Sequence, residues 1–73
     1  MLDEAFVQGI VERHYDDVLA YCRRHAPVRD AAEDLAQETF LRFVRHAQAY
    51  EERGKPLALL LTIARNLCAD AAR

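Results

Sequence analysis

The stretch from Asp30 to Arg45, DAAEDLAQETFLRFVR, constrains the fold most, because its apolar residues recur at the period of an α-helix. Side chains three and four residues apart share a helix face, so one face of this stretch is apolar. The residues on that face are Ala32, Leu35, Ala36, Thr39, Phe40, Phe43, Val44 and Ala47. We therefore expect an amphipathic helix over about 30–47 that packs on a hydrophobic core.

Two further apolar stripes at helical period predict one helix before this stretch, over about 3–26, and one after it, over about 56–72. The stripe of the first helix contains Val7, Val11, Tyr15, Val18, Leu19, Cys22 and Ala26, with Phe6 and Ile10 beside it. The stripe of the last helix contains Leu57, Leu60, Leu61, Ala64, Leu67, Cys68 and Ala71, widened by Leu59 and Ile63. Asp3 fits the N-cap of the first helix, and Pro56 fits the first position of the last.

The connections between these helices predict a compact all-α, three-helix domain over residues 1–73. Pro27 ends the first helix, and the connection to Asp30 is so short that the two helices must be antiparallel neighbours. Asp30 is expected to cap the central helix, with Glu33 completing a capping-box-like pair. Residues 48–55 contain Gly54, show no apolar period and are expected to form a loop.

Composition and charge narrow the class of protein. A net charge of −2 argues against a protein that coats nucleic acid non-specifically. The start of the central helix is acidic, whereas the segment from Lys55 onward is mildly basic, which indicates two different partners. The sequence contains neither a membrane span nor a basic leader, so we expect a cytoplasmic protein. Cys22 and Cys68 are expected to be reduced, buried small hydrophobes.

The central helix has a second face that carries Asp34, Gln37, Glu38 and Arg45, with Leu41 among them. A fully solvated face favours a charge at the position of Leu41, so the leucine indicates a docking surface. Single exposed leucines are also common on soluble proteins. Spacing alone leaves both interpretations of Leu41 open.

The last helix also has a polar face, formed by Thr62, Arg65, Asn66 and Arg73 together with Ala69. Threonine, arginine and asparagine side chains reach base edges and phosphates in DNA grooves. An ordinary solvated helix face has the same composition, and composition alone favours that simpler interpretation. Tyr50 in the loop is open to a similar choice, between packing on the core and stacking on an unpaired base.

The chain shows no arrangement typical of an enzyme, such as a nucleophile with its base or a phosphate-binding glycine loop. A candidate metal set is His14, Cys22, His25 and Cys68, but it lacks the paired, closely spaced ligands of zinc sites. The carboxylates of the central helix fit capping and docking better than acid–base catalysis. We therefore expect no catalytic site, no metal and no cofactor.

AEDLAQETF and TIARNLCAD, in this order, resemble region 2 of bacterial RNA polymerase sigma factors of the sigma-70 family. The resemblance is strongest to the extracytoplasmic-function (ECF) group and covers nearly the whole chain, including YCRRHAPVRD before the central helix. It implies a non-enzymatic transcription initiation factor domain. Such a domain docks on the clamp helices of the largest subunit of core RNA polymerase, and recognises and melts the promoter −10 element.

Carried over residue by residue, the resemblance implies a polymerase-binding set formed by Asp34, Gln37, Glu38 and Leu41. It implies a DNA-binding set formed by Tyr50, Lys55, Thr62, Arg65, Asn66 and Arg73. Leu59 and Val44 stand where the family commonly has tryptophan, and the loop is about one residue longer than usual.

The absent tryptophans favour an alternative function, a sigma-like interaction module that binds polymerase or an anti-sigma factor without reading DNA. Members of this family also carry a second, region 4-like domain for the −35 element. We expect that domain to lie outside these 73 residues, and the helical sequence running up to Arg73 indicates a fragment.

Overall fold

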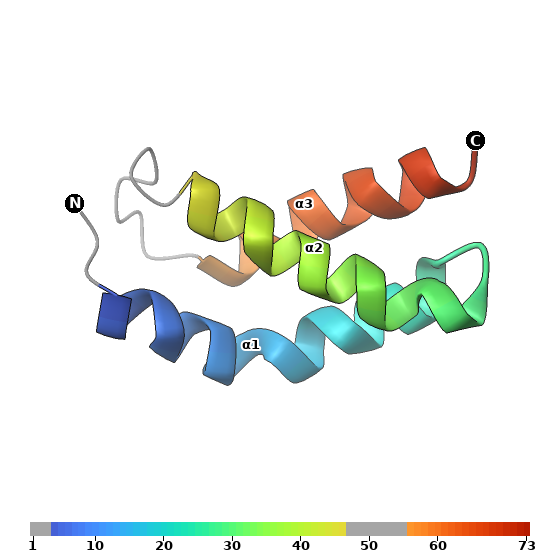
Figure 1. Cartoon of the computed structure of the whole chain (residues 1–73). Coiled ribbons are helices and arrows are strands. Elements are labelled where there is room, and N and C mark those ends of the chain that lie inside the picture. The colour runs from blue at the N-terminus through green and yellow to red at the C-terminus, as the bar shows by residue number, and fades with distance from the viewer. Residues whose placement is uncertain (1–3, 47–55) are drawn as a thin grey trace.

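The computed structural model describes residues 4–46 and 56–73 and folds them into helices only. The elements are α1 (Glu4–His25), a short 3-10 turn η1 (Arg29–Ala31), α2 (Ala32–Arg45) and α3 (Pro56–Ala71). Figure 1 shows α2 running back along α1, with α3 beside both, and every pair of these helices is in contact. The predicted all-α, three-helix architecture is confirmed. No helix in the described ranges is both long and apolar enough to cross a membrane.

Several sequence predictions fall on residues outside these ranges. They are the Asp3 cap, the apolar contact of Ala47, and the roles of Tyr50 and Lys55 in the loop. These predictions therefore stay predictions.

α1 ends where Pro27 requires it to end. The backbone N–H of Ala26 still donates to the carbonyl of Cys22 at 2.8 Å, which completes the last turn. Proline disfavours helical geometry in the residue before it and has no N–H to continue the hydrogen-bond ladder. The chain therefore leaves the helix after His25 and returns within a few residues as α2.

The predicted Asp30 cap of the central helix is wrong. Asp30 lies inside the 3-10 turn, and the residues at the cap positions are Val28 for the turn and Ala31 for α2. Neither cap position has a side-chain capping hydrogen bond. The short connection winds into a 3-10 turn in which the N–H of Ala31 donates to the carbonyl of Val28 at 3.0 Å. The N–H of Ala32 donates in turn to the carbonyl of Arg29. A backbone carbonyl thus bonds an N–H that an Asp30 cap would otherwise have bonded.

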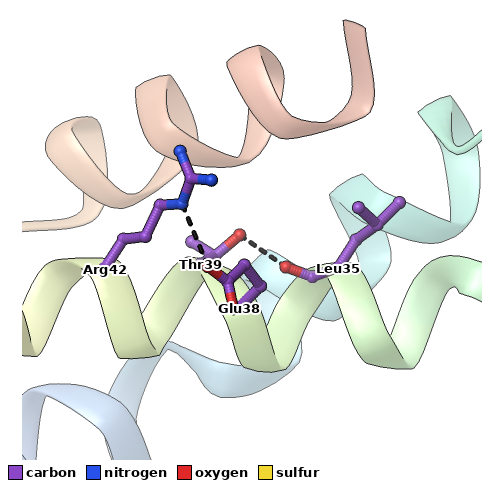
Figure 2. Close-up of polar contacts among 4 residues, drawn as sticks. All are labelled: Leu35, Glu38, Thr39 and Arg42. Atoms are coloured by element: carbon purple, nitrogen blue, oxygen red, sulfur yellow. Dashed lines mark hydrogen bonds and ion pairs between the residues drawn. The ribbon is translucent and has the colours of Figure 1, made fainter. Parts of the chain in front are cut away.

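The hydrophobic core lies between the three helices. Its buried apolar residues are Ile10, Val18, Cys22, Ala32, Ala36, Phe40, Phe43, Leu60, Ala64, Leu67 and Cys68. Phe43 is the largest fully buried side chain, and small residues such as Ala36 and Ala64 let the helices pack closely around it. Thr39 is also fully buried, and its hydroxyl donates to the carbonyl of Leu35 at 2.7 Å (Figure 2). A buried hydroxyl without that bond would be destabilising.

Three of the described residues assigned to the apolar stripes are exposed. Phe6 is 42% exposed, Val44 is 48% exposed, and Ala71 is exposed in the last turn of α3. Phe6 and Ala71 lie near helix ends, where fewer neighbours cover them. Val44 lies at the edge of the α2 stripe and lines an open groove between α1 and α2.

Candidate docking surface and candidate nucleic-acid surface

The outer face of α2 brings the four predicted polymerase-binding residues together. Asp34, Gln37 and Leu41 are exposed and Glu38 is partly exposed, so each side chain is accessible to a partner. The helix positions them because their spacings of three and four residues place them on one side of α2. We call Asp34, Gln37, Glu38 and Leu41 the docking face.

Glu38 is held by an arginine that the sequence analysis did not assign to the site. The Nε–H of Arg42 donates to Glu38 Oε2 at 3.1 Å, one helical turn further along α2 (Figure 2). Glutamate followed four residues later by arginine is a known helix-stabilising spacing, so this pair was readable from the sequence. Both side chains are partly exposed, and such pairs contribute little to stability. The carboxylate of Glu38 can therefore leave Arg42 and pair with a cation of a partner.

An open apolar groove of about 310 Å³ adjoins the docking face. It lies between α1 and α2 and is lined by Val11, Tyr15, Gln37, Phe40, Leu41 and Val44. The rings of Tyr15 and Phe40 stack in its lining, with centroids 5.6 Å apart and an interplanar angle of 21°. Since Gln37 and Leu41 belong to both features, the docking face and this α1–α2 groove form one continuous surface.

The contribution of α1 to this surface was not predicted from the sequence. Val11 and Tyr15 were assigned to the buried stripe, and both are partly buried against the core. Their outer edges line the groove together with Val44. The sequence did contain a sign of this groove. Leu41 and Val44 are aliphatic residues three positions apart at the border of a polar face, which indicates an apolar patch there.

The outer face of α3 carries Thr62, Arg65 and Asn66, all exposed. The Thr62 hydroxyl donates to the carbonyl of Ala58 at 3.0 Å, which leaves its oxygen as an acceptor for a partner. Arg73 lies just beyond the end of α3, and its Nη1 is 3.9 Å from Asp70 Oδ1. This face therefore combines a guanidinium, an amide and a hydroxyl, groups that bind phosphates and base edges.

The two cysteines lie together in the core. Cys22 on α1 and Cys68 on α3 are free, buried thiols. Burial is the main cause that raises the pKa of Cys22 from 9.0 to about 11, and the Cys68 thiol adds to the rise. Among residues 4–46 and 56–73, no three histidine, cysteine or acidic side chains gather as metal ligands would.

Comparisons with known proteins identify the family of the chain. Residues 10–73 match the family model for sigma-70 region 2. The chain is 39% identical over 62 residues to the ECF RNA polymerase sigma factor BldN of Streptomyces coelicolor. That match covers 84% of this chain and 24% of the relative, so the chain spans about a quarter of the relative's length. No solved structure matches the chain significantly.

The family match confirms the resemblance on which the site residues were predicted. It includes both motifs that carried the resemblance, AEDLAQETF on α2 and TIARNLCAD on α3. The relative is itself an ECF sigma factor, in agreement with the group that the motifs indicated. The chain belongs to the sigma-70 region 2 family.

Proposed function

We propose that this domain acts in transcription initiation by binding core RNA polymerase and recognising the promoter −10 element. The docking face of α2 would bind the clamp helices of the largest polymerase subunit, and the outer face of α3 would lie against promoter DNA. Membership of the sigma-70 region 2 family supports this proposal, as does the similarity to an RNA polymerase sigma factor.

The observation that carries the proposal is the continuity of the docking face with the α1–α2 groove. Leu41 is 53% exposed and Val44 is 48% exposed, directly beside Glu38 and Gln37. A solvated helix face gains nothing from two exposed aliphatic side chains, whereas a docking surface buries them on binding. Carboxylates at the rim pair with arginines of a basic partner and fix the register of the helices.

Promoter recognition would use groups of two kinds. The Arg65 guanidinium and the Asn66 amide can donate to phosphates and base edges, while the Thr62 oxygen can accept. The resemblance adds Arg73 and Lys55 as phosphate contacts and Tyr50 as a platform for an unstacked base. Binding of unpaired bases and of exposed single strand offsets the lost pairing, so opening requires no hydrolysis.

The alternative, an interaction module that does not read DNA, draws its support from Leu59. This leucine occupies a position where the family commonly has tryptophan, and its side chain packs against the core. A leucine cannot stack on a base as an aromatic ring does. Binding to a single-stranded oligonucleotide that carries a −10-like sequence separates the two functions, because only the promoter-reading domain should bind it.

The substitution Glu38→Lys tests the docking face. Charge reversal replaces attraction with repulsion at the rim, so the Kd for core polymerase should rise at least about tenfold. Glu38→Lys also breaks the ion pair with Arg42, and Arg42→Gln is therefore the matched control. Arg42→Gln removes the same pair but keeps the carboxylate, and it should leave binding within about twofold.

Circular dichroism and polymerase binding are measured for both variants. A folded Glu38→Lys variant with unchanged affinity would contradict the proposed docking face. Equal losses in the two variants would mean that the ion pair, and not the free carboxylate, matters for binding.

A further inference from the structure

A second groove, with a volume of about 320 Å³, lies between α1 and α3, which run in the same direction in Figure 1. The residues that line it are Asp17, Ala20, Tyr21, Arg24, Leu57 and Leu61. None of them belongs to the docking face or to the polar set Thr62, Arg65 and Asn66 on α3. We call this feature the α1–α3 groove, and neither proposed surface gives it a role.

The two charged residues of the α1–α3 groove carry opposite charges but are too far apart to pair with each other. Asp17 and Arg24 are exposed and lie seven residues apart on α1, about 10 Å along the helix axis. Asp17 Oδ2 lies 4.0 Å from His14 Nδ1, which is too long for a hydrogen bond. Among residues 4–46 and 56–73, Arg24 forms no ion pair. Both charges are therefore available to a partner.

Apolar and aromatic groups lie between and beside these two charges. Ala20 is exposed, and its small side chain lets a second helix approach α1 closely. The half-buried ring of Tyr21 packs on the ring of His25, with centroids 4.2 Å apart. Leu57 and Leu61 of α3 are also half-buried, so a partner that covers the groove would remove further apolar area from water.

We propose that the α1–α3 groove is a self-association site, at which two copies of this chain pair with their α1 helices antiparallel. The two-fold axis of the pair passes between Ala20 and Tyr21. Asp17 lies as far before this point as Arg24 lies after it, so each Asp17 faces Arg24 of the second copy. The same patch on both copies thus forms two equivalent ion pairs, as a two-fold interface requires.

The charges of the groove favour this occupant over others. A partner of uniform charge is attracted at one end of the groove and repelled at the other, because Asp17 and Arg24 differ in sign. A parallel arrangement of two α1 helices sets Asp17 against Asp17, so repulsion opposes it. The antiparallel second copy places an opposite charge at both ends.

The size of the patch determines how strong the association is. Stable interfaces contain about 20–30 residues on each side. Six residues line the α1–α3 groove, so we expect a weak dimer with a Kd on the order of 100 µM. Exposed ion pairs add little to affinity, but they determine the orientation of the two copies.

Sedimentation equilibrium measures the dimer Kd of the purified protein at low salt, over about 10 µM to 1 mM. Asp17→Arg and Arg24→Asp should each raise the Kd at least about tenfold, because each variant sets like charges together at both ends. An equal mixture of the two variants should recover the wild-type Kd to within about threefold. In the mixed dimer, both pairs are attractive again, and the same holds for two copies of the double variant.

Asp16→Arg and Arg23→Asp are the matched controls. They make the same charge changes at neighbouring exposed positions of α1 that do not line the groove. Each should leave the Kd within about twofold of the wild-type value. Circular dichroism checks that all variants keep their helix content, which is expected because the substituted side chains are exposed.

A wild-type protein that stays monomeric at 1 mM would overturn the proposal. Equal losses in the groove variants and their controls would also overturn it, as would a mixture of Asp17→Arg and Arg24→Asp that stays monomeric. The measurement requires neither polymerase nor DNA, so its outcome is independent of the proposed function.

Discussion

The docking face with its α1–α2 groove and the outer face of α3 rest on the same core but differ in chemistry. The former combines exposed aliphatic side chains with carboxylates, and two helices contribute to it. The latter consists of polar side chains from α3 alone, in the part of it that the structure describes. The first surface has a composition that water does not favour, whereas the second resembles any solvated helix face.

The difference follows from what the two proposed partners require of a surface. The proposed protein partner would bury apolar area on binding, and Leu41 and Val44 expose such area in the domain. A nucleic acid requires hydrogen-bonding groups and positive charge, which the free domain can expose at no cost. The docking surface is therefore recognisable from physics, while the α3 surface is recognisable chiefly from its motif.

Phe43→Ala should produce the largest effect and abolish the difference between the surfaces, because Phe43 supports both. Its ring is fully buried where the three helices meet, and truncation of such a ring costs about 3–5 kcal/mol of unfolding free energy. A domain of this size is only marginally stable, so both binding activities should fall together. Urea denaturation measures the loss, and Val28→Ala, at an exposed site away from the groove, is the control. A stable Phe43→Ala variant that loses one activity alone would refute a shared core.

Alkaline pH should weaken the same core through Cys22. Its pKa is raised by burial from 9.0 to about 11, so between these values the unfolded chain has lost a proton that the folded chain retains. The contribution to stability is complete below about pH 9 and declines by up to about 3 kcal/mol as pH rises to about 11. Chemical denaturation at several pH values measures it. Cys22→Ala should lack this component, and an unchanged pH slope in that variant would exclude Cys22 as its source.

Much of this fold was predictable because its signals are local. Pro27 marks the end of α1, and the apolar period predicts that Phe40 and Phe43 lie inside. The prediction of an Asp30 cap was wrong because backbone carbonyls in a 3-10 turn accept the N–H groups at the start of α2. Sequence spacing does not decide between a side-chain cap and such a turn. The predicted burial of Val44 was wrong because it depends on how closely α1 approaches α2, which is a tertiary property.

In the candidate site, too, local features could be predicted from the sequence and tertiary features could not. The sequence was enough to predict that one face of α2 carries Asp34, Gln37, Glu38 and Leu41, because a single helix places them there. The Arg42 partner of Glu38 was equally local and was overlooked. The groove was not predictable, since Tyr15 of α1 and Phe40 of α2 line it only after the two helices have packed.

Leu41→Asp should separate the two surfaces most sharply. An added charge at the groove would have to be desolvated on docking, so we expect polymerase affinity to fall by about 2 kcal/mol, roughly 30-fold. DNA binding and unfolding free energy should change little, because Leu41 is 53% exposed. Val28→Asp is a close control, since Val28 is an aliphatic residue with 59% exposure that lies away from the groove. Equal losses of polymerase binding in both variants would indicate a general effect of negative charge.

The double substitution Arg65→Ala with Asn66→Ala should have the smallest effect and act on the other surface. Both side chains are exposed on α3, and only Arg65 carries a charge. We therefore expect a modest loss of about 1 kcal/mol in the free energy of binding to a single-stranded −10-like oligonucleotide. If Arg65 contacts a phosphate, the slope of log affinity against log salt should also decrease in magnitude by about one. Polymerase affinity should stay unchanged. Arg23→Ala, which removes an equal charge from an exposed position on α1, is the control. An equal loss with Arg23→Ala would show that DNA binding depends on the net charge of the domain and not on the α3 face. In that case only the docking face would remain as a specific binding surface.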